Sequence, residues 1–339
     1  MASLAKSYER EKLLGQHFTP EFIVRKILDG VGFNSKKFLG KSVLDPACGD
    51  GRFLLDVVKR IIKFSSKSDL KRNLLMVNGW DIDPCAVQSC IENLNLLVES
   101  VGIKVNWNIL CTDSIKRSSS YLNLFSANDD FQYDYIIGNP PYIRIQHLNE
   151  EQRDYIQRNY RFCNSGSTDI FIAFFELCFN LLKKEGFAGL ITPNTFFYTE
   201  TAKELRDFFA KQKCIKQITN YGIIQLFDNA TTYSAITIFD KQGHLNFKYQ
   251  QANGKNDFVE RSIKFSELQD QKFWQLSAEK KIKINGKQLK DICKIHVGVT
   301  TLCDRAYIFP IEKINDNYVY ANTKLKGSVK IEKAILKPQ

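Results

Sequence analysis

The sequence predicts an α/β protein with a doubly wound, mostly parallel sheet of seven strands and a smaller C-terminal region. Two observations predict this fold class. Over residues 1–240, short β-rich runs alternate with helical stretches, which is the pattern of a parallel sheet covered by helices on both faces. After residue 240 this alternation fades, and short strands such as Ala306–Phe309 and Tyr318–Tyr320 are expected. We therefore place a domain boundary near residue 245, between a main domain (1–245) and a C-terminal region (246–339).

The predicted strands are short runs rich in β-branched and apolar residues. In chain order they are Ser42–Leu44, Leu75–Trp80, Val105–Leu110, Tyr133–Ile137, Phe187–Ile191, Ile215–Tyr221 and Ser234–Phe239. Helical patterns cover Pro20–Asp29, Phe53–Lys63, Pro84–Ser100 and Asp169–Lys184. The first helix has a cap-like Thr19 before it and Gly30 after it. The last is apolar nearly all round, which predicts a buried helix that Gly186 stops.

The net charge of +11 is concentrated in the last third of the chain. Residues 1–240 contain 29 Lys and Arg against 27 Asp and Glu, whereas residues 241–339 contain 19 against 10. A surface that binds the phosphate backbone of a nucleic acid would carry a basic excess of this kind. A solvated basic face would produce it equally well, so the charge alone does not identify a nucleic acid partner.

Composition and pattern exclude several classes of protein. The sequence has no run of about 18 apolar residues, so no transmembrane helix is expected. Its polar start, Met1–Lys12, argues against a signal peptide. The nine cysteines are scattered without a CxxC pair, and Cys48, Cys90 and Cys178 stand in apolar surroundings. We therefore expect reduced core cysteines, no metal site and a cytoplasmic location.

Four loops that follow predicted strands contain the candidate ligand-binding and catalytic residues. They lie at the edge where open parallel sheets bind ligands. The first runs from Asp45 through Gly49 and Gly51 into a helix. The glycines allow a ligand to lie against the backbone, and Asp45 can accept hydrogen bonds from an ammonium group. Because an acidic loop repels a pyrophosphate, a cationic methionine-type ligand suits it better than a dinucleotide. An ordinary strand-to-helix turn is the alternative.

The second and third loops each place a carboxylate directly after a strand. Asp81 stands where a ribose diol is bound bidentately, and Asp83, just before Pro84, suits a cap of the next helix. Asp113 ends the third strand, where its carboxylate could accept the amino group of an adenine. For the second loop, two capping residues are the alternative interpretation.

The fourth loop is Asn139-Pro140-Pro141-Tyr142, after the strand at 133–137. Exocyclic amines on bases are poor nucleophiles because the lone pair is delocalised into the ring. The Asn139 side-chain oxygen and the Pro140 carbonyl offer two acceptors for the two N–H bonds of such an amine. Consecutive prolines stiffen the loop, and the Tyr142 ring can stack on a base. The tetrapeptide therefore predicts methylation of a planar nitrogen. A plain proline turn would not require an Asn before it and an aromatic residue after it.

Taken together, these segments resemble the amino-group DNA methyltransferases of restriction–modification systems, in the γ arrangement. In that order a segment like Gly15–Pro20 comes first, followed by the glycine loop, the catalytic tetrapeptide and a target-recognition domain. The resemblance covers roughly residues 15–240. It implies a Rossmann-like methyltransferase domain over 1–245 that uses S-adenosyl-L-methionine. Residues 246–339 would then be a linker and the start of a recognition domain, which is unusually short or truncated.

The resemblance also assigns roles to residues of this sequence. The catalytic residues would be Asn139, Pro140, Pro141 and Tyr142, with Tyr142 and Phe227 stacking on the two faces of the extruded target base. Asp81 would hold the ribose and Asp113 the adenine of the cofactor. The full set of expected cofactor-binding residues is Phe18, Thr19, Pro20, Asp45, Pro46, Ala47, Gly49, Gly51, Asp81, Ile82, Asp113, Ser114 and Asn139.

We therefore expect a site-specific adenine-N6 methyltransferase acting on a flipped adenine in double-stranded DNA. It would be the modification component of a restriction–modification system, with a cognate restriction endonuclease or a specificity subunit as a possible partner. The main alternative is a protein glutamine-N5 methyltransferase, because an amide nitrogen poses the same chemical problem. That family carries a helical domain before the glycine loop and ends soon after the sheet, unlike this chain. Cytosine-N4 methylation, RNA base methylation and a non-enzymatic DNA-binding subunit are weaker alternatives.

Overall fold

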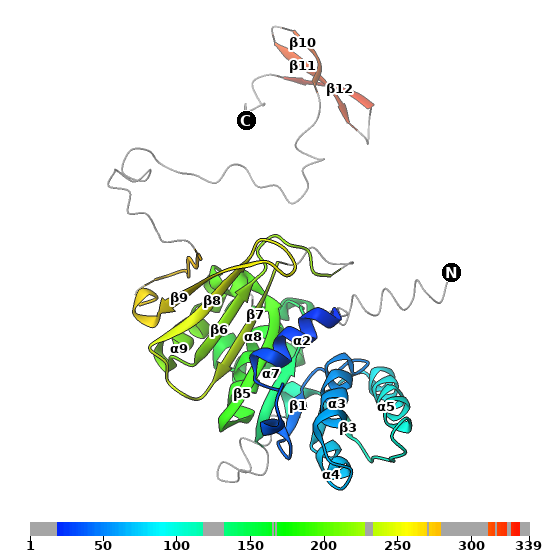
Figure 1. Cartoon of the computed structure of the whole chain (residues 1–339). Coiled ribbons are helices and arrows are strands. Elements are labelled where there is room, and N and C mark those ends of the chain that lie inside the picture. The colour runs from blue at the N-terminus through cyan, green and yellow to red at the C-terminus, as the bar shows by residue number, and fades with distance from the viewer. Residues whose placement is uncertain are drawn as a thin grey trace. The chain divides into compact units, whose positions relative to one another are not determined.

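The computed structural model describes residues 19–117, 132–164, 166, 168–227, 233–269, 271–278, 311–315, 317–323 and 327–332. It divides into two compact units, Met1–Lys280 and Lys281–Gln339. The first unit is a large sheet with helices packed on it, and the second contains a small antiparallel sheet (Figure 1). All strands predicted between residues 42 and 239 belong to the first unit.

The described part of the first unit contains one sheet of nine strands. Their order is β3 (Asn108–Cys111), β2 (Val77–Asp81), β1 (Val43–Asp45), β4 (Tyr133–Gly138), β5 (Leu182–Pro193), β7 (Ser234–Asp240), β6 (Ile215–Asn220), β8 (Asn246–Ala252) and β9 (Phe258–Lys264). The five strands from β3 to β5 are parallel, β7 is antiparallel to both of its neighbours, β6 and β8 are parallel, and β9 is antiparallel to β8. The chain order reverses between β1 and β4. The carboxyl ends of these two strands are therefore the switch point at which such sheets bind ligands.

The predicted α/β class is confirmed, and each of the seven predicted strands is present. The predicted strand count is wrong, because the described sheet has nine strands. The two additional strands, β8 and β9, form an antiparallel hairpin at the edge of the sheet beside β6. They were missed because their sequence is polar: in β8 only Phe247, Tyr249 and Gln250 are buried, and β9 is largely exposed. The sheet thus continues past residue 245, and the compact unit extends to Lys280. The functional division of the chain stays a prediction.

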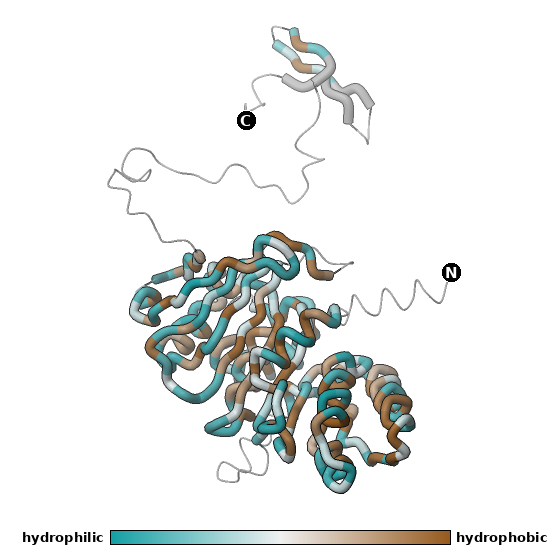
Figure 2. Tube along the Cα trace, in the orientation of Figure 1, coloured by the Kyte–Doolittle hydropathy of each residue, from teal (hydrophilic) through white to brown (hydrophobic). Residues whose placement is uncertain are grey.

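Helices cover both faces of the sheet, as a doubly wound fold requires. They are α2 (Glu21–Gly30), α3 (Arg52–Phe64), α4 (Leu70–Leu74), α5 (Pro84–Glu99), α7 (Glu150–Asn159), α8 (Ile170–Leu181) and α9 (Lys203–Gln212), with short 3-10 turns η1 (Lys36–Phe38), η3 (Ile145–His147), η4 (Arg161–Cys163), η5 (Asn194–Phe197), η6 (Glu200–Ala202) and η7 (Phe265–Glu267). Val43 packs with α2, α3 and α5 on one face, whereas its neighbour Leu44 packs with α8 and α9 on the other. Because successive strand residues point to opposite faces, the central strands are apolar along their length (Figure 2).

The buried helix predicted over Asp169–Lys184 is shorter than expected. α8 ends at Leu181, and β5 begins at the next residue. Eight of its 12 residues are buried, which agrees with its apolar pattern. Gly186 does not stop the helix. It lies in β5 against β4, where a Cβ atom would come within 2.9 Å of the backbone oxygens of Tyr133 and Asp134, so the close approach of two strands explains this glycine.

The second unit contains three antiparallel strands, β10 (Ile311–Ile314), β11 (Tyr318–Thr323) and β12 (Gly327–Glu332), with β11 in the middle. The predicted strand Tyr318–Tyr320 lies within β11, and the predicted strand Ala306–Phe309 lies outside the described residues. In neither unit is any described helix long and apolar enough to cross a membrane. Cys48, Cys90 and Cys178 are buried and free of disulfides, as expected.

Candidate active site

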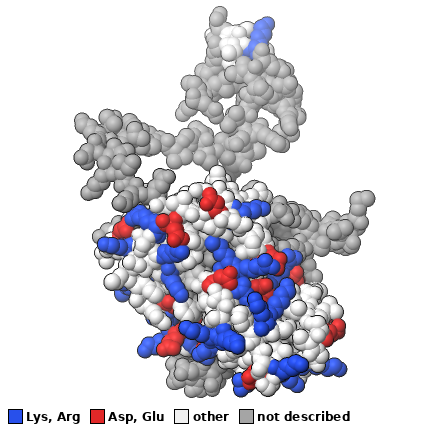
Figure 3. Space-filling view, in the orientation of Figure 1, with Lys and Arg blue, Asp and Glu red and all other residues white. Residues whose placement is uncertain are grey.

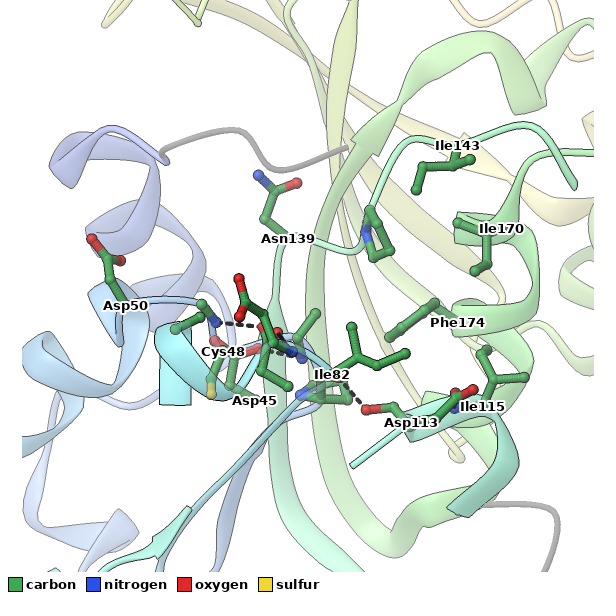
Figure 4. Close-up of a pocket in the computed structure, with 18 of the residues that line it drawn as sticks. Asp45, Cys48, Asp50, Ile82, Asp113, Ile115, Asn139, Ile143, Ile170 and Phe174 are labelled. Atoms are coloured by element: carbon green, nitrogen blue, oxygen red, sulfur yellow. Dashed lines mark hydrogen bonds between the residues drawn. The ribbon is translucent and has the colours of Figure 1, made fainter. Parts of the chain in front are cut away.

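A cavity of about 560 Å³ opens at the carboxyl ends of β1, β2, β3 and β4, at the switch point of the sheet. Its volume is within the range of pockets for small-molecule ligands and cofactors. Figure 4 shows a polar side formed by the loops that contain Asp45 and Asp113, and an opposite apolar side that includes Ile170 and Phe174. Asn139, the first residue of the tetrapeptide, lies at the wall of the cavity.

The β1 loop folds around the carboxylate of Asp45. This side chain is only 1% exposed, and its Oδ1 accepts a hydrogen bond of 3.1 Å from the Ala47 backbone N–H. Gly49 has φ +53° and lines the cavity, and a Cβ there would meet no atom within 4 Å. This glycine is required by its backbone conformation, and it leaves the loop surface open to a ligand.

Gly51 lies at the start of α3, close to a second helix. It is absent from the described lining of the cavity, has φ +92° and directly precedes α3. A Cβ at this position would lie 2.7 Å from Sγ of Cys90 in α5. Gly51 therefore permits the close packing of α5 on the start of α3, and its expected contact with a cofactor remains a prediction.

The two carboxylates of the β2 loop divide their roles. Asp81 accepts hydrogen bonds from the backbone N–H groups of Gly49 (2.8 Å) and Asp83 (2.9 Å), so it ties the β1 and β2 loops together. Asp83 accepts from the Cys85 N–H at 3.0 Å and caps α5, as interpreted from the sequence. Asp81 also lines the cavity, and the neighbouring Ile82 presents a side chain that is 52% exposed.

The β3 loop brings Asp113 and Ser114 to the same cavity. The Asp113 carboxylate accepts hydrogen bonds from the N–H groups of Ile115 (3.0 Å) and Lys116 (3.3 Å), which fixes the turn after the strand. Ser114 Oγ donates to the Pro46 carbonyl oxygen at 2.5 Å and so joins this loop to the β1 loop. These contacts hold the three loops as one wall.

The cavity is acidic. Burial raises the pKa of Asp45 to about 8, an effect that the hydrogen bond from Ala47 opposes and the charge of Asp81 adds to. Burial likewise raises the pKa of Asp81. Two lining cations, Arg52 and Lys116, are paired with Asp50 and Glu151. With a pKa of about 8, the Asp45 carboxyl is largely protonated at neutral pH, and a cationic ligand would favour its ionised form. Among the residues that the structure describes, no group of His, Cys, Asp and Glu side chains is suited to hold a metal ion.

The tetrapeptide begins at the end of β4, next to this wall. Gly138 ends the strand, and a Cβ on it would lie 2.7 Å from Oδ1 of Asp45, so a glycine is needed between β4 and the buried carboxylate. Asn139 Nδ2 donates a hydrogen bond of 3.1 Å to Oγ1 of Thr19. Thr19 is not the expected cap of α2, because Pro20 is the N-cap residue and no side-chain cap is formed. Its hydroxyl contacts the tetrapeptide instead.

Tyr142 is partly buried beside the sheet. Its hydroxyl donates to the Ile191 carbonyl oxygen at 3.3 Å, and burial raises its pKa. Its ring meets Phe171 and Phe227 edge to face, at centroid distances of 6.4 and 6.3 Å and interplanar angles of 77°. Phe227 is 3% exposed. The two rings proposed to stack on a base are thus brought together, but not as parallel faces, so that role remains a prediction and requires the rings to move.

Most of the expected site residues converge on the cavity. Those that line it are Thr19, Asp45, Pro46, Ala47, Gly49, Asp81, Ile82, Asp113, Ser114, Asn139 and Pro141. Pro20, Gly51, Pro140, Tyr142 and Phe227 lie outside its described lining, and Phe18 lies outside the described residues.

Sequence reasoning missed the apolar side of the cavity. It is formed by Ile143, Leu148, Tyr155, Ile156, Ile170 and Phe174, which come from the segment after the tetrapeptide and from α7 and α8. These residues carry no polar motif and have the spacing of ordinary core residues. The position of the segment directly after Tyr142 was the available signal for them.

Residues 76–227 match the family model described as Eco57I restriction-modification methylase. Over this range the chain is therefore similar to restriction-modification methylases. It is 24% identical to RM.Eco57I of Escherichia coli, a type II restriction enzyme and methyltransferase, over 89% of this chain and 37% of that protein. The chain thus spans well under two thirds of the length of this relative.

Solved structures share the fold of this chain. A protein from Listeria monocytogenes described as a class I S-adenosylmethionine-dependent methyltransferase has a TM-score of 0.51 at 20% identity, covering 71% of this chain and 67% of that one. DrdV in complex with DNA has a TM-score of 0.55 at 17% identity, covering 71% of this chain and 27% of that one. At these identities the likeness establishes the fold alone.

Proposed function

We propose that this protein is a methyltransferase that transfers the methyl group of S-adenosyl-L-methionine to the N6 amino group of an adenine flipped out of duplex DNA. The observation that carries the proposal is the position of Asn139-Pro140-Pro141-Tyr142 at the wall of an acidic, cofactor-sized cavity. A methyl donor in the cavity and an amine held by the tetrapeptide would then lie on two sides of the same strand end.

The cavity residues suit each part of this cofactor. Its ammonium group and sulfonium centre are cationic, which fits the buried Asp45 and the open backbone at Gly49. Asp81 offers a carboxylate for the ribose diol, and the exposed face of Ile82, with Ile170 opposite, suits a flat adenine ring. When bound, the cofactor supplies an electrophilic methyl group on sulfur.

The tetrapeptide would hold and activate the target amine. The Asn139 side-chain oxygen and the Pro140 carbonyl oxygen would accept hydrogen bonds from its two N–H groups. These hydrogen bonds would shift the nitrogen toward tetrahedral geometry as the methyl group arrives. The Tyr142 ring contacts the base, and Phe227 would supply a second aromatic face once the edge-to-face pair opens. No strong base is needed, because the proton can leave after the nitrogen has attacked the methyl carbon.

Duplex DNA is the proposed partner because an adenine amine within a helix must be extruded before it can react. The basic excess supports this partner, since residues 281–339 contain 12 Lys and Arg against 5 Asp and Glu. On the face of the first unit seen in Figure 3, Lys and Arg are instead interspersed with Asp and Glu. We also propose a cognate restriction endonuclease or specificity subunit as a partner, since RM.Eco57I is described as both restriction enzyme and methyltransferase.

The experiment is methyl transfer from tritiated S-adenosyl-L-methionine to unmethylated duplex DNA. Wild-type protein should label the DNA, and Asn139→Ala should lower the rate by about 10²- to 10³-fold while leaving cofactor affinity nearly unchanged. Asn246→Ala, at an exposed position of β8, is the matched control and should keep the wild-type rate. Label that appears only on a protein substrate would favour glutamine-N5 methylation and overturn the proposal.

A further inference from the structure

One hydrogen bond joins two segments that are 120 residues apart in the chain. Asn139 Nδ2 donates to Thr19 Oγ1 at 3.1 Å, and both side chains line the cavity. Thr19 is 4% exposed. Because it makes no capping hydrogen bond to α2, its buried hydroxyl has no role in starting that helix. Its contact with the catalytic tetrapeptide is therefore the feature to explain.

The direction of this hydrogen bond matters for the proposed reaction. The amide of an asparagine can be turned so that either Oδ1 or Nδ2 faces a given neighbour. Only Oδ1 can accept a hydrogen bond from an N–H group of a target amine, so Nδ2 must face elsewhere during transfer. With Nδ2 directed to Thr19, the amide has the required orientation.

A hydroxyl alone does not fix that orientation, since it can both donate and accept. If Thr19 donates its own proton to a neighbouring anion, the oxygen is left only as an acceptor for Asn139. The methionine moiety of the proposed cofactor carries a carboxylate, and Thr19 lines the same cavity as Asp45, Ala47 and Gly49. The bound carboxylate would then determine which way the Thr19 hydroxyl points, and through it which way the amide points.

We propose that Thr19 is a positioning residue that couples cofactor binding to the orientation of Asn139. Its hydroxyl donates to the cofactor carboxylate and accepts from Asn139 Nδ2, which holds Asn139 Oδ1 ready for the target amine. The inference rests on the proposed function, because it concerns the same cofactor and the same transfer. It assigns to Thr19 a contribution to the rate of transfer in addition to cofactor affinity.

The test compares Thr19→Val, which keeps the shape but loses the hydroxyl, with Thr19→Ser, which keeps the hydroxyl. Single-turnover transfer to duplex DNA is measured at saturating cofactor. Thr19→Val should lower this rate about tenfold, the effect of losing one net hydrogen bond, whereas Thr19→Ser should stay close to wild type. Thr201→Val, at a half-buried position away from the cavity, is the matched control.

Binding supplies a second readout that does not depend on turnover. The affinity for S-adenosylhomocysteine, which keeps the carboxylate, should fall about tenfold in Thr19→Val. The affinity for 5′-methylthioadenosine, which lacks the amino acid part, should not change. A merely structural role of Thr19 would weaken both ligands alike and would overturn the inference.

The outcomes separate the inference from the proposed function. If wild-type protein transfers no methyl group to DNA, the proposed function and this inference both fail. If wild type and Thr19→Val transfer at the same rate once each is saturated with cofactor, the inference fails alone. If Thr19→Ser is as slow as Thr19→Val, the hydroxyl is not the active group, and the inference also fails.

Discussion

Replacing Asp45 with Asn should stabilise the fold and at the same time abolish cofactor binding. The Asp45 carboxyl is 1% exposed, and burial raises its pKa from 3.8 to about 8. Asn has a similar shape, keeps an oxygen for the Ala47 N–H and carries no charge to bury. The substitution therefore removes the electrostatic penalty of the empty site together with the charge that a cationic ligand needs.

The magnitude follows from proton linkage. With a folded-state pKa above the unfolded value, folding binds a proton, so the stability of the wild type falls as pH rises between about 4 and 8. Each pH unit in this window corresponds to about 1.4 kcal/mol, which gives about 4 kcal/mol at pH 7. Above pH 8 both states are ionised and the penalty is constant.

Urea unfolding at pH 5 and pH 8, without cofactor, measures this effect. The advantage of Asp45→Asn over wild type should grow by about 4 kcal/mol between the two conditions, and its thermal midpoint at pH 8 should rise by roughly 8–16 °C. S-adenosylhomocysteine should stabilise wild type but not the variant. A difference in stability that is the same at both pH values would refute the reasoning, as would a variant less stable than wild type at pH 8.

Three further predictions concern the cavity and the partner. The wild-type Kd for S-adenosylhomocysteine should rise about tenfold per unit as pH falls below 8 in titration calorimetry, and a flat profile would exclude Asp45 as the titrating group. Gly138→Ala should weaken binding of S-adenosylhomocysteine at least about tenfold, because its Cβ would lie 2.7 Å from Asp45 Oδ1. Gly243→Ala, where a Cβ would meet open space, is the control and should bind this ligand normally. The affinity for duplex DNA should fall at least about tenfold between 50 and 200 mM salt, which is the effect of roughly two phosphate contacts. Binding that does not depend on salt would contradict contacts between basic side chains and DNA phosphates.

The polar side of the site could be predicted from the sequence because it follows the ends of strands. Asp45, Asp81 and Asp113 each stand directly at or after a parallel strand, and the carboxyl ends of neighbouring parallel strands meet at one edge. The cap role of Asp83 could be predicted as well, since Pro84 marks the first position of a helix.

Other parts depend on tertiary packing and leave little trace in the sequence. Gly51 ends the glycine loop and Gly138 ends β4, yet the neighbours that require these glycines, Cys90 and Asp45, lie far away in the chain. The apolar side of the cavity comes from α7 and α8, whose residues have the spacing of a normal core. Strand β8, between β6 and the edge strand β9, was missed because few of its side chains are buried, so its pattern is that of a polar loop.

The role of Thr19 likewise could not be predicted from the local sequence. A Thr followed by Pro before a helix is typical of a cap, and local sequence favours that interpretation. The structure places its hydroxyl on Asn139 instead, a partner that no local pattern indicates. Only the folded sheet, which brings the start of α2 to the end of β4, makes this contact.

The modified nucleoside found in cellular DNA identifies the base that the protein methylates. The chain and its Asn139→Ala variant are expressed in a host that lacks adenine methylation, and the cellular DNA is digested and analysed for modified nucleosides. We predict N6-methyladenine in DNA from cells that express the wild-type chain and none above background with the variant. N4-methylcytosine in place of N6-methyladenine, or equal N6-methyladenine with both proteins, would contradict the account.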